Sequence, residues 1–206
     1  MNATQRFARM ATSLVVHRPV LWRVFRRPVR ALFDRVAPRW DSMRGPAHLF
    51  PLEAALAQLD RAPRTALDLG TGTGDGAVVI ARRWPEARVV GADLSPQMVE
   101  EARRKLPADL AERVSFDVAD AARLAYGDGA FELVALLNMI PFFDELARVT
   151  ASGGTLVIAF SRGAGTPIYV APERLRAELG RRGFADFRDV SAGDGSAVVA
   201  RKRRAG

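Results

Sequence analysis

The segment from residue 66 to residue 76 constrains the fold of this chain more than any other. The apolar run Ala66-Leu67-Asp68-Leu69 is followed at once by Gly70-Thr71-Gly72-Thr73-Gly74, and a helical pattern begins near Asp75. This order predicts a buried strand, a tight turn and a helix. Because glycine lacks a side chain, the backbone of the turn can approach a ligand closely, beside the free N–H groups of the helix. We therefore expect a parallel sheet with a ligand site at this turn.

Apolar runs and helical patterns alternate along the rest of the chain. The predicted strands are residues 65–69, 88–92, 114–117, 131–137, 154–160, 186–190 and 196–201. The predicted helices of this region are residues 75–84, 96–106, 142–150 and 172–182. Strands that alternate with helices predict an α/β fold with a doubly wound parallel sheet. The short turn at 192–195 predicts a hairpin, so the last of the seven strands should run antiparallel to its neighbour.

Residues 1–62 are interpreted as a helical N-terminal extension, and residues 63–206 as the sheet domain. One helix is predicted from Pro19 to about Val36, with Pro28 expected to kink or split it, and another from 46 to 59. Residues 1–44 contain ten arginines and two aspartates, a net charge of +8, which equals that of the whole chain. The arginines lie opposite an apolar stripe, a pattern that is typical of segments bound to an anionic membrane surface.

The composition excludes several kinds of protein. The chain has 206 residues, 49% of them hydrophobic, which fits one globular domain plus an extension. It contains no cysteine, so disulfides and thiolate metal sites are excluded, and no metal site is predicted. No apolar run approaches the roughly 20 residues of a membrane span, and Leu14-Val15-Val16 is too short for a secretion signal. We therefore expect a cytoplasmic protein that can associate with a membrane surface.

A nucleoside-containing cofactor is predicted at the glycine-rich turn. Asp93 lies 19 residues after Gly74, at the end of the next apolar run, where a carboxylate can bind ribose hydroxyls. The stretch 72–77 also satisfies the G-x-G-x-x-G/A pattern of nicotinamide dinucleotide sites. However, Asp68 and Asp75 would repel a pyrophosphate, because like charges repel. Asp120, after the third predicted strand, can accept a hydrogen bond from an adenine amino group. These acids favour S-adenosylmethionine over a dinucleotide.

Several motifs, in order along the chain, carry a family resemblance. They are Leu67–Gly74, Gly91–Met98, Asp120-Ala121, Phe131–Val134 and Leu146–Leu156. With them the chain resembles the class I S-adenosylmethionine-dependent methyltransferases over about residues 33–201. The segment Phe33–Asp41 is similar to the entry segment of the ubiquinone/menaquinone C-methyltransferase branch. The resemblance implies a Rossmann-like, seven-stranded fold and a methyltransferase activity.

The fold and the resemblance together place the cofactor site at the ends of the strands. The residues expected to bind S-adenosylmethionine are Asp68, Gly70, Thr71, Gly72, Gly74, Asp93, Leu94, Met98, Asp120, Ala121 and Asn138. The glycines would line the methionine part, and Asp93 would bind the ribose. Leu94 and Met98 would flank the adenine ring, whose edge would meet Asp120.

The acceptor side of the site carries fewer signals. Asn138, at the tip of the fourth strand, and Trp40 are the candidates to face the acceptor, and no catalytic base is identifiable. The residues after Asn138 are Met139-Ile140-Pro141-Phe142-Phe143, without the N/D-P-P-Y tetrad, which disfavours methylation of a base amine. So short a connection should leave the site open on this side unless the N-terminal extension covers it as a lid. The bulky residues of the extension that could do so are Phe33, Trp40 and Met43.

The sequence is compatible with functions of different classes. We favour methyl transfer to a small, lipophilic acceptor such as a quinone precursor, by in-line displacement at the activated methyl group. The alternative is an RNA or protein methyltransferase that binds its substrate through the arginine-rich N-terminus. Nucleic acid is disfavoured because the aromatic residues of that segment form an apolar face. A protein that binds the cofactor without catalysis is a third interpretation. The sequence does not indicate the oligomeric state.

Overall fold

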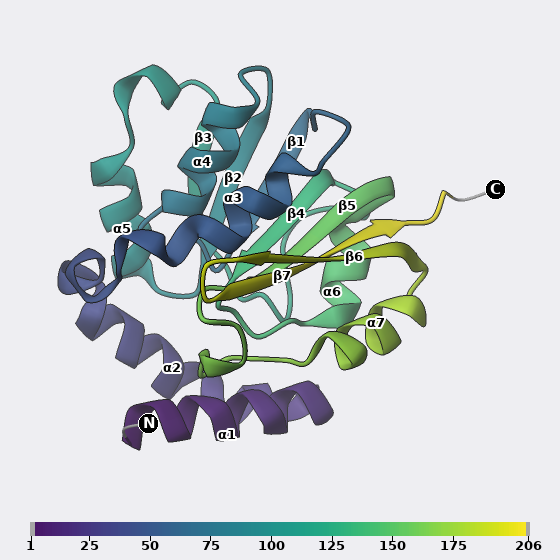
Figure 1. The fold of residues 1–206 in the computed structure, drawn as a ribbon. Helices are drawn as coiled ribbons and strands as arrows, with labels where there is room; N and C mark the ends of the chain where they lie inside the picture. Colours follow the sequence, from purple (N-terminus) through teal and green to yellow (C-terminus); the bar gives the residue numbers. More distant parts are fainter. Residues whose placement is uncertain (1–2, 205–206) are drawn as a thin grey trace.

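Seven strands form one mixed sheet in the computed structural model, which describes residues 3–204 (Figure 1). The strands are β1 (Thr65–Leu69), β2 (Arg88–Asp93), β3 (Val114–Val118), β4 (Phe131–Leu137), β5 (Thr150–Phe160), β6 (Phe184–Ala192) and β7 (Gly195–Lys202). Their order across the sheet is β3-β2-β1-β4-β5-β7-β6. Strands β1 to β5 pair in parallel, whereas β7 runs antiparallel to both β5 and β6. The predicted seven-stranded sheet with an antiparallel last strand is therefore confirmed.

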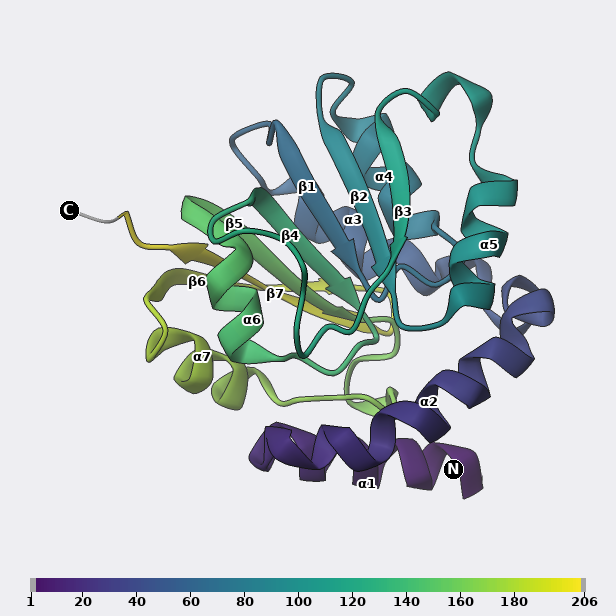
Figure 2. The same cartoon turned by 180° about the vertical axis from the view of Figure 1, so that it is seen from behind.

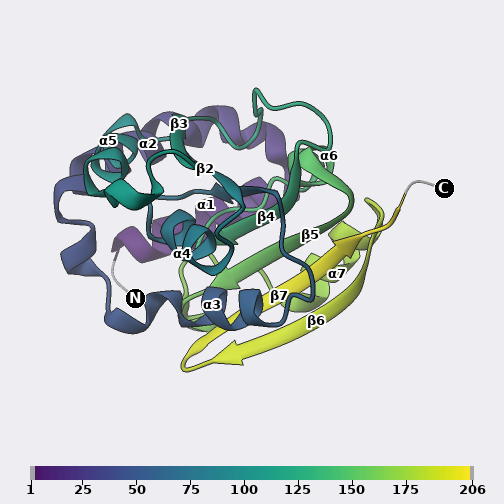
Figure 3. The same cartoon turned by 90° about the horizontal axis from the view of Figure 1, so that it is seen from above.

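Helices cover both faces of the sheet, as Figures 1 and 2 show from opposite sides. Helices α3 (Phe50–Ala57), α4 (Asp75–Arg83) and α5 (Pro96–Lys105) lie on one face, and α6 (Phe143–Val149) and α7 (Pro172–Gly180) on the other (Figure 3). Each face has its own hydrophobic core, with Leu56 and Ile80 fully buried in the first and Leu146 and Leu175 in the second. Burying one such side chain contributes about 1.5–3 kcal/mol. Apolar contact thus holds both layers in the predicted doubly wound arrangement.

The N-terminal extension lies across the edge of the sheet where the parallel strands end (Figure 2). It consists of α1 (Ala3–His17), α2 (Trp22–Val36) and short 3₁₀ turns at Pro19–Leu21, Ala37–Arg39, Asp41–Met43 and Pro46–Leu49. Arg9 of α1 donates to the carbonyl oxygens of Ala164 at 2.7 Å and Thr166 at 3.1 Å. The side chains of Val15 and Trp22 join the hydrophobic core beneath α6 and α7. The extension is therefore packed against the sheet domain from its first helix, for which the sequence predicted no element.

Helix α2 continues through Pro28 without the predicted split. Pro28 is exposed, while Trp22, Phe25 and Val29 lie on the face that packs against the domain. Packing of an amphipathic face supplies most of the stability of such a helix. The helix therefore tolerates the loss of the one backbone hydrogen bond that proline cannot donate. The helix predicted for 46–59 is instead a 3₁₀ turn followed by α3, whose first turn contains a proline.

Two strands, β5 and β6, are each four residues longer than their sequence patterns predict. Thr150 begins β5, although it was predicted as the last residue of a helix that in fact ends at Val149. Thr150 pairs with Phe131 before an irregularity in the β4–β5 register, so the turn around Gly153 belongs to the strand. β6 spans 184–192 rather than 186–190, with a register shift near its start. Where strand pairing is bulged, apolar and polar residues do not alternate regularly along the strand. The sequence pattern therefore did not predict these added strand residues.

Candidate functional site

The glycine-rich turn between β1 and α4 forms the centre of the candidate site. Gly70, Gly72 and Gly74 have positive φ angles of 74°, 55° and 92°, which residues with a side chain rarely adopt. A Cβ atom on Gly70 would lie 2.8 Å from Cγ and Sδ of Met139. One on Gly72 would lie 3.2 Å from Nε1 of Trp40. The turn therefore requires glycine for its backbone conformation and for the close approach of its neighbours.

The turn lies where the strand order of the sheet reverses. β1 is flanked by β2 and β4, and the chain leaves these strands toward opposite faces of the sheet. The N–H groups of Gly70 and Thr71 donate to the carbonyl oxygen of Ala92, at 2.7 and 3.0 Å, which fixes the turn to the end of β2. Ligands of open α/β sheets bind at such a switch point, outside the carboxyl ends of the strands.

Asp68 braces the turn from beneath. Its carboxylate is 2% exposed and accepts a hydrogen bond from the Thr71 hydroxyl at 2.6 Å and another from the Ala77 N–H. A Cβ on Gly76 would lie 2.7 Å from Oδ2, so α4 begins directly against this group. Burial raises the pKa of Asp68 to about 6, although the Thr71 hydroxyl and the Ala77 N–H favour the charged form. Asp68 thus orders the turn, while its predicted contact with the cofactor stays a prediction.

Asp93, the last residue of β2, connects the turn to the start of α5. Its Oδ2 accepts from the Gly72 N–H and its Oδ1 from the Ser95 N–H, both at 2.9 Å. The Ser95 hydroxyl in turn caps α5 by accepting from the Met98 N–H at 3.1 Å. Burial raises the pKa of Asp93, against the effect of these backbone donors. The carboxylate therefore lies at the strand end beside the turn, as the sequence predicted.

Asp120 follows the neighbouring strand β3. Asp93 pairs with Val118 in the sheet, so Asp120 lies two residues beyond the partner of Asp93, at the same edge. Its Oδ1 accepts from the Ala122 N–H at 3.0 Å and from Nε1 of Trp22 at 2.7 Å. The remaining residues predicted near the adenine differ in exposure: Ala121 is buried, Leu94 is half-buried and Met98 is fully buried. Met98 therefore presents no surface to a ligand in this structure.

Asn138 joins the ends of β4 and β5. Its φ is 55°, a conformation that asparagine tolerates better than most residues. Its amide oxygen accepts from the N–H of Ser161 and its amide nitrogen donates to the hydroxyl of Ser161, both at 2.9 Å. These bonds hold the side chain against β5 at the predicted edge of the sheet. A role for Asn138 toward cofactor or acceptor stays a prediction.

Trp40 of the extension lies against the glycine-rich turn, beside the position that a Cβ of Gly72 would fill. The ring of Phe33 packs edge-on against it, with ring centroids 5.5 Å apart. Met43, the third residue considered for a lid, is 63% exposed and so does not cover the turn. The extension therefore reaches the site through two of its three candidate residues.

A cluster of charges that sequence reasoning missed fastens the extension to α4 and α5. Arg44 Nη2 lies 2.7 Å from Asp75 Oδ2, and Lys105 Nζ lies 2.5 Å from Asp41 Oδ2 and 3.1 Å from Asp75 Oδ1. Burial would raise the pKa of Asp75, but contacts with His48, Arg44 and Lys105 outweigh it and lower the pKa. Since Arg44 and Lys105 neutralise Asp75, its charge no longer weighs against a pyrophosphate. No local sequence signal links residues so far apart.

The sequence of residues 66–154 matches a family described as a methyltransferase domain. Over 139 residues the chain is 41% identical to a demethylmenaquinone methyltransferase of Thermus thermophilus, covering 62% of this chain and 63% of that protein. Residues 66–154 belong to the class I S-adenosylmethionine-dependent methyltransferases.

Further comparisons agree with this family. A demethylmenaquinone methyltransferase of Deinococcus radiodurans is 35% identical over 142 residues, which are 63% of this chain and 58% of that protein. The crystal structure of an S-adenosylmethionine-dependent methyltransferase from Aquifex aeolicus matches with a TM-score of 0.67 and 20% identity, over 80% of this chain and 97% of that one. This structural likeness shows a shared fold. The chain spans about three fifths of the length of these curated relatives.

The residues of this methyltransferase fit S-adenosylmethionine, the cofactor of the family. The ligand offers ribose hydroxyls and an adenine amino group as donors, and the carboxylates of Asp93 and Asp120 are acceptors at adjacent strand ends. The turn at Gly70 and Gly72 gives a backbone surface without side chains for close approach. The positively charged sulfur and amino group of S-adenosylmethionine also suit an edge of the sheet that carries buried acidic side chains. The choice over a dinucleotide rests on these acceptors and on the family.

Proposed function

We propose that this chain transfers the methyl group of S-adenosylmethionine to a small, lipophilic acceptor. The observation that carries the proposal is the pair of carboxylates, Asp93 and Asp120, at the ends of adjacent strands beside a turn that only glycine can form. The cofactor supplies a methyl group that is activated by its positively charged sulfur. The task of the protein is to hold the acceptor in line with that group and to exclude water.

An apolar wall beside the site supports a lipophilic acceptor. Ile140, Phe142 and Phe143 follow β4 and are only 6–8% exposed. The sequence predicts an opening on this side unless the N-terminal extension covers it, and Trp22 of the extension packs edge-on against Phe142, with ring centroids 5.2 Å apart. The relatives named above carry demethylmenaquinone in their names, which supports a quinone-like acceptor for this chain as well. The comparisons lend no support to an RNA or protein acceptor.

A screen of acceptors tests the proposed reaction. Purified protein is incubated with S-adenosylmethionine and a panel of quinols, phenols, fatty acids and RNA, and release of S-adenosylhomocysteine is measured. We expect release with a quinol or phenol, and slower release with the Asp93→Ala protein at the same limiting concentration of S-adenosylmethionine. Release with RNA alone would contradict the lipophilic acceptor, and binding without release for the whole panel would favour a protein that binds the cofactor without catalysis.

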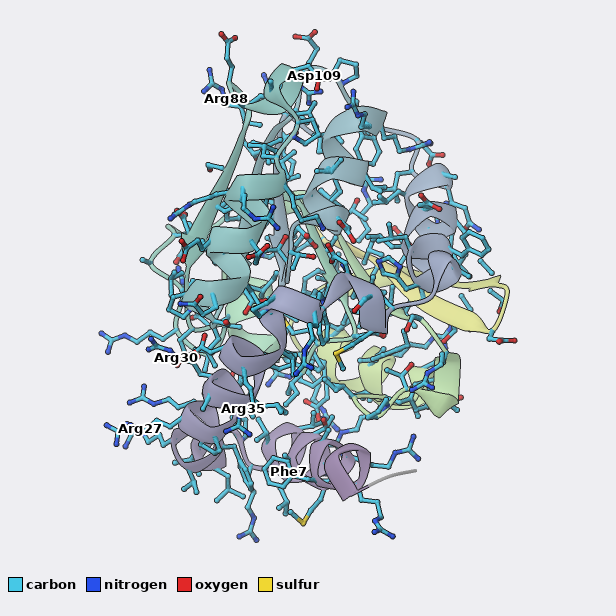
Figure 4. The ribbon with its side chains drawn as sticks, turned by 90° about the vertical axis from the view of Figure 1, so that its left-hand side faces the viewer. Phe7, Arg27, Arg30, Arg35, Arg88 and Asp109 are labelled. Carbon is cyan, nitrogen blue, oxygen red and sulfur yellow. The ribbon has the colours of Figure 1, made fainter. Side chains whose placement is uncertain are left out.

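We further propose that the extension binds an anionic membrane surface, where a lipophilic acceptor would be found. Val20 and Val24 are 67% and 68% exposed and lie among the arginines of the extension. Figure 4 shows Arg27 and Arg30 projecting away from α2 at one end of the molecule, with Arg88 and Asp109 at the other end. Exposed aliphatic side chains beside cations suit the interface of an anionic bilayer. None of the helices in residues 3–204 is both long and apolar enough to span a membrane.

Reversing two positive charges of the extension should strongly weaken binding to anionic vesicles. Arg23 and Arg27 are exposed, and we expect the double change Arg23→Glu, Arg27→Glu to weaken co-sedimentation with phosphatidylserine vesicles by at least roughly thirtyfold, since each cation near such a surface contributes about 1 kcal/mol. The control Arg88→Glu, Arg188→Glu makes the same change of net charge at exposed positions away from the extension. If both variants and the unchanged protein co-sediment equally with the vesicles, the proposal that the extension binds the membrane surface is contradicted.

Trp40 should distinguish the charged cofactor from its uncharged product. An aromatic face attracts a sulfonium as it attracts other cations, so Trp40→Ala should weaken S-adenosylmethionine more than S-adenosylhomocysteine, by up to about 1 kcal/mol. Titration calorimetry with both ligands measures the difference, and Trp40→Phe, which keeps an aromatic ring, is the matched control. Equal losses of affinity for the two ligands would show that the ring packs against the turn without sensing the charge.

A further inference from the structure

Helix α2 engages the carboxylate that we assign to the adenine amino group. Trp22 is 7% exposed, and its indole N–H donates to Asp120 Oδ1 at 2.7 Å. The same oxygen accepts from the Ala122 N–H at 3.0 Å, so both of its lone pairs are used. One turn further along α2, Arg26 Nη1 lies 3.7 Å from the other oxygen, Oδ2. Asp120 is thus engaged by two side chains of the extension.

The extension contacts two further parts of the same edge. Asp34 of α2 accepts from the hydroxyl of Ser95, the residue that caps α5 after Asp93, at 2.5 Å. The indole of Trp40 lies against Gly72, whose N–H is bonded to the carboxylate of Asp93. The extension therefore touches the regions assigned to adenine, ribose and methionine together.

We propose that Trp22 competes with the adenine of S-adenosylmethionine for Asp120, so that α2 gates the cofactor site. The proposal rests on the role given to Asp120 under the proposed function. An indole N–H and an adenine amino group are both N–H donors on planar aromatic rings, and the lone pair that Trp22 uses is not available to a second donor. Adenine therefore reaches this oxygen only when the indole leaves it. The apparent affinity for the cofactor is then reduced by the fraction of molecules in which Trp22 is still docked.

Removing the indole N–H should tighten cofactor binding. Trp22→Phe keeps an aromatic ring against Phe142 but has no donor for Asp120, so we expect its dissociation constant for S-adenosylmethionine to fall on the order of tenfold, as for loss of a competing hydrogen bond to a charged group. Trp84→Phe is the matched control, because Trp84 is similarly buried in the core of the other face, and its affinity should not change. Titration calorimetry measures all three proteins.

The indole N–H of Trp22 in the unchanged protein gives a second measurement. This measurement tests the competition between Trp22 and adenine even if Trp22→Phe does not fold. The chain has three tryptophans, so a ¹H–¹⁵N spectrum contains three indole signals, which single Trp→Phe variants assign. Adding 5′-methylthioadenosine, which carries the adenine, should shift the Trp22 signal and speed its hydrogen exchange. Adding methionine, which lacks the adenine, should do neither.

The outcomes separate the gate from the proposed function. A Trp22 signal that S-adenosylmethionine leaves unmoved, with unchanged affinity of Trp22→Phe, would overturn the gate but leave cofactor binding intact. Weaker binding by Trp22→Phe would also overturn it, because Trp22 would then orient Asp120 for the adenine instead of competing with it. Absence of S-adenosylmethionine binding by every variant and the unchanged protein would overturn the cofactor assignment itself, and the gate with it.

Discussion

Replacing Asp93 with alanine should lower the affinity for S-adenosylmethionine by roughly tenfold to a hundredfold. Hydrogen bonds to a charged group contribute on the order of 1.5–3 kcal/mol, and the carboxylate would lose its bonds to the ribose hydroxyls. The change would also free the N–H of Gly72, which Asp93 Oδ2 accepts at 2.9 Å, and so loosen the turn on which the methionine part is expected to lie. Titration calorimetry of the purified variant measures the loss.

Two controls make this result specific. Asp109→Ala removes a carboxylate that pairs with Arg82 on the surface, far along the chain from the turn, and should bind the cofactor normally. Thermal unfolding of both variants shows whether the Asp93 protein is still folded at the temperature of the titration. Unchanged affinity in folded Asp93→Ala would place the ribose elsewhere, and tight NAD binding without S-adenosylmethionine binding would contradict the cofactor assignment.

Replacing Asp68 with asparagine should remove a pH dependence of stability of about 3 kcal/mol. The native pKa of Asp68 is about 6, above its ordinary value of 3.8, because the carboxyl group is buried. Between pH 3.8 and about pH 6, the native state holds a proton that the unfolded state has released. The free energy of unfolding therefore falls as the pH rises through this range. The shift of about two units corresponds to about 3 kcal/mol, and the loss is complete above about pH 6.

Urea unfolding at pH 4, 5, 6 and 7 tests this sign. The stability of the unchanged protein relative to Asp68→Asn should decrease across the series and then level off. Asp75→Asn is the matched control with the opposite sign, because the pKa of Asp75 is lowered by its neighbours. The stability that Asp75 contributes is present above pH 3.8 and is lost only as the pH falls through its native pKa. Parallel pH profiles for the unchanged protein and Asp68→Asn would show that burial does not raise the pKa of Asp68.

The parts of the site that the sequence predicts are those set by local geometry. The run from Asp68 to Gly74 places a strand, a turn and a helix in succession, and each step depends on neighbouring residues only. Asp93 and Asp120 follow because parallel strands bring their carboxyl ends to the same edge, so position along each strand determines position in the site. The antiparallel β7 was predictable from the short turn at 192–195, which joins it to β6 as a hairpin.

Contacts between distant segments were not predictable from one sequence. Trp22 and Asp120 are 98 residues apart, and Arg44 and Asp75 are 31 apart. The periodic apolar face of α2 indicates which side of the helix is buried, but it does not indicate which surface buries it. For this reason the sequence did not indicate that Trp22 is the residue of the extension that packs against the buried ring of Phe142.

The docking of α1 has a consequence for the order in which the chain folds during synthesis. Arg9 binds the carbonyl oxygen of a residue 155 positions later, and Arg174 bonds to His17 across 157 positions. On the ribosome α1 therefore emerges long before its partners exist, and its amphipathic surface has no place on the protein until the segment after β5 and helix α7 are made. Because domains fold as their segments become available, closure of the extension is a late event. Helix α1 is thus made before its partners but reaches its native position only after them.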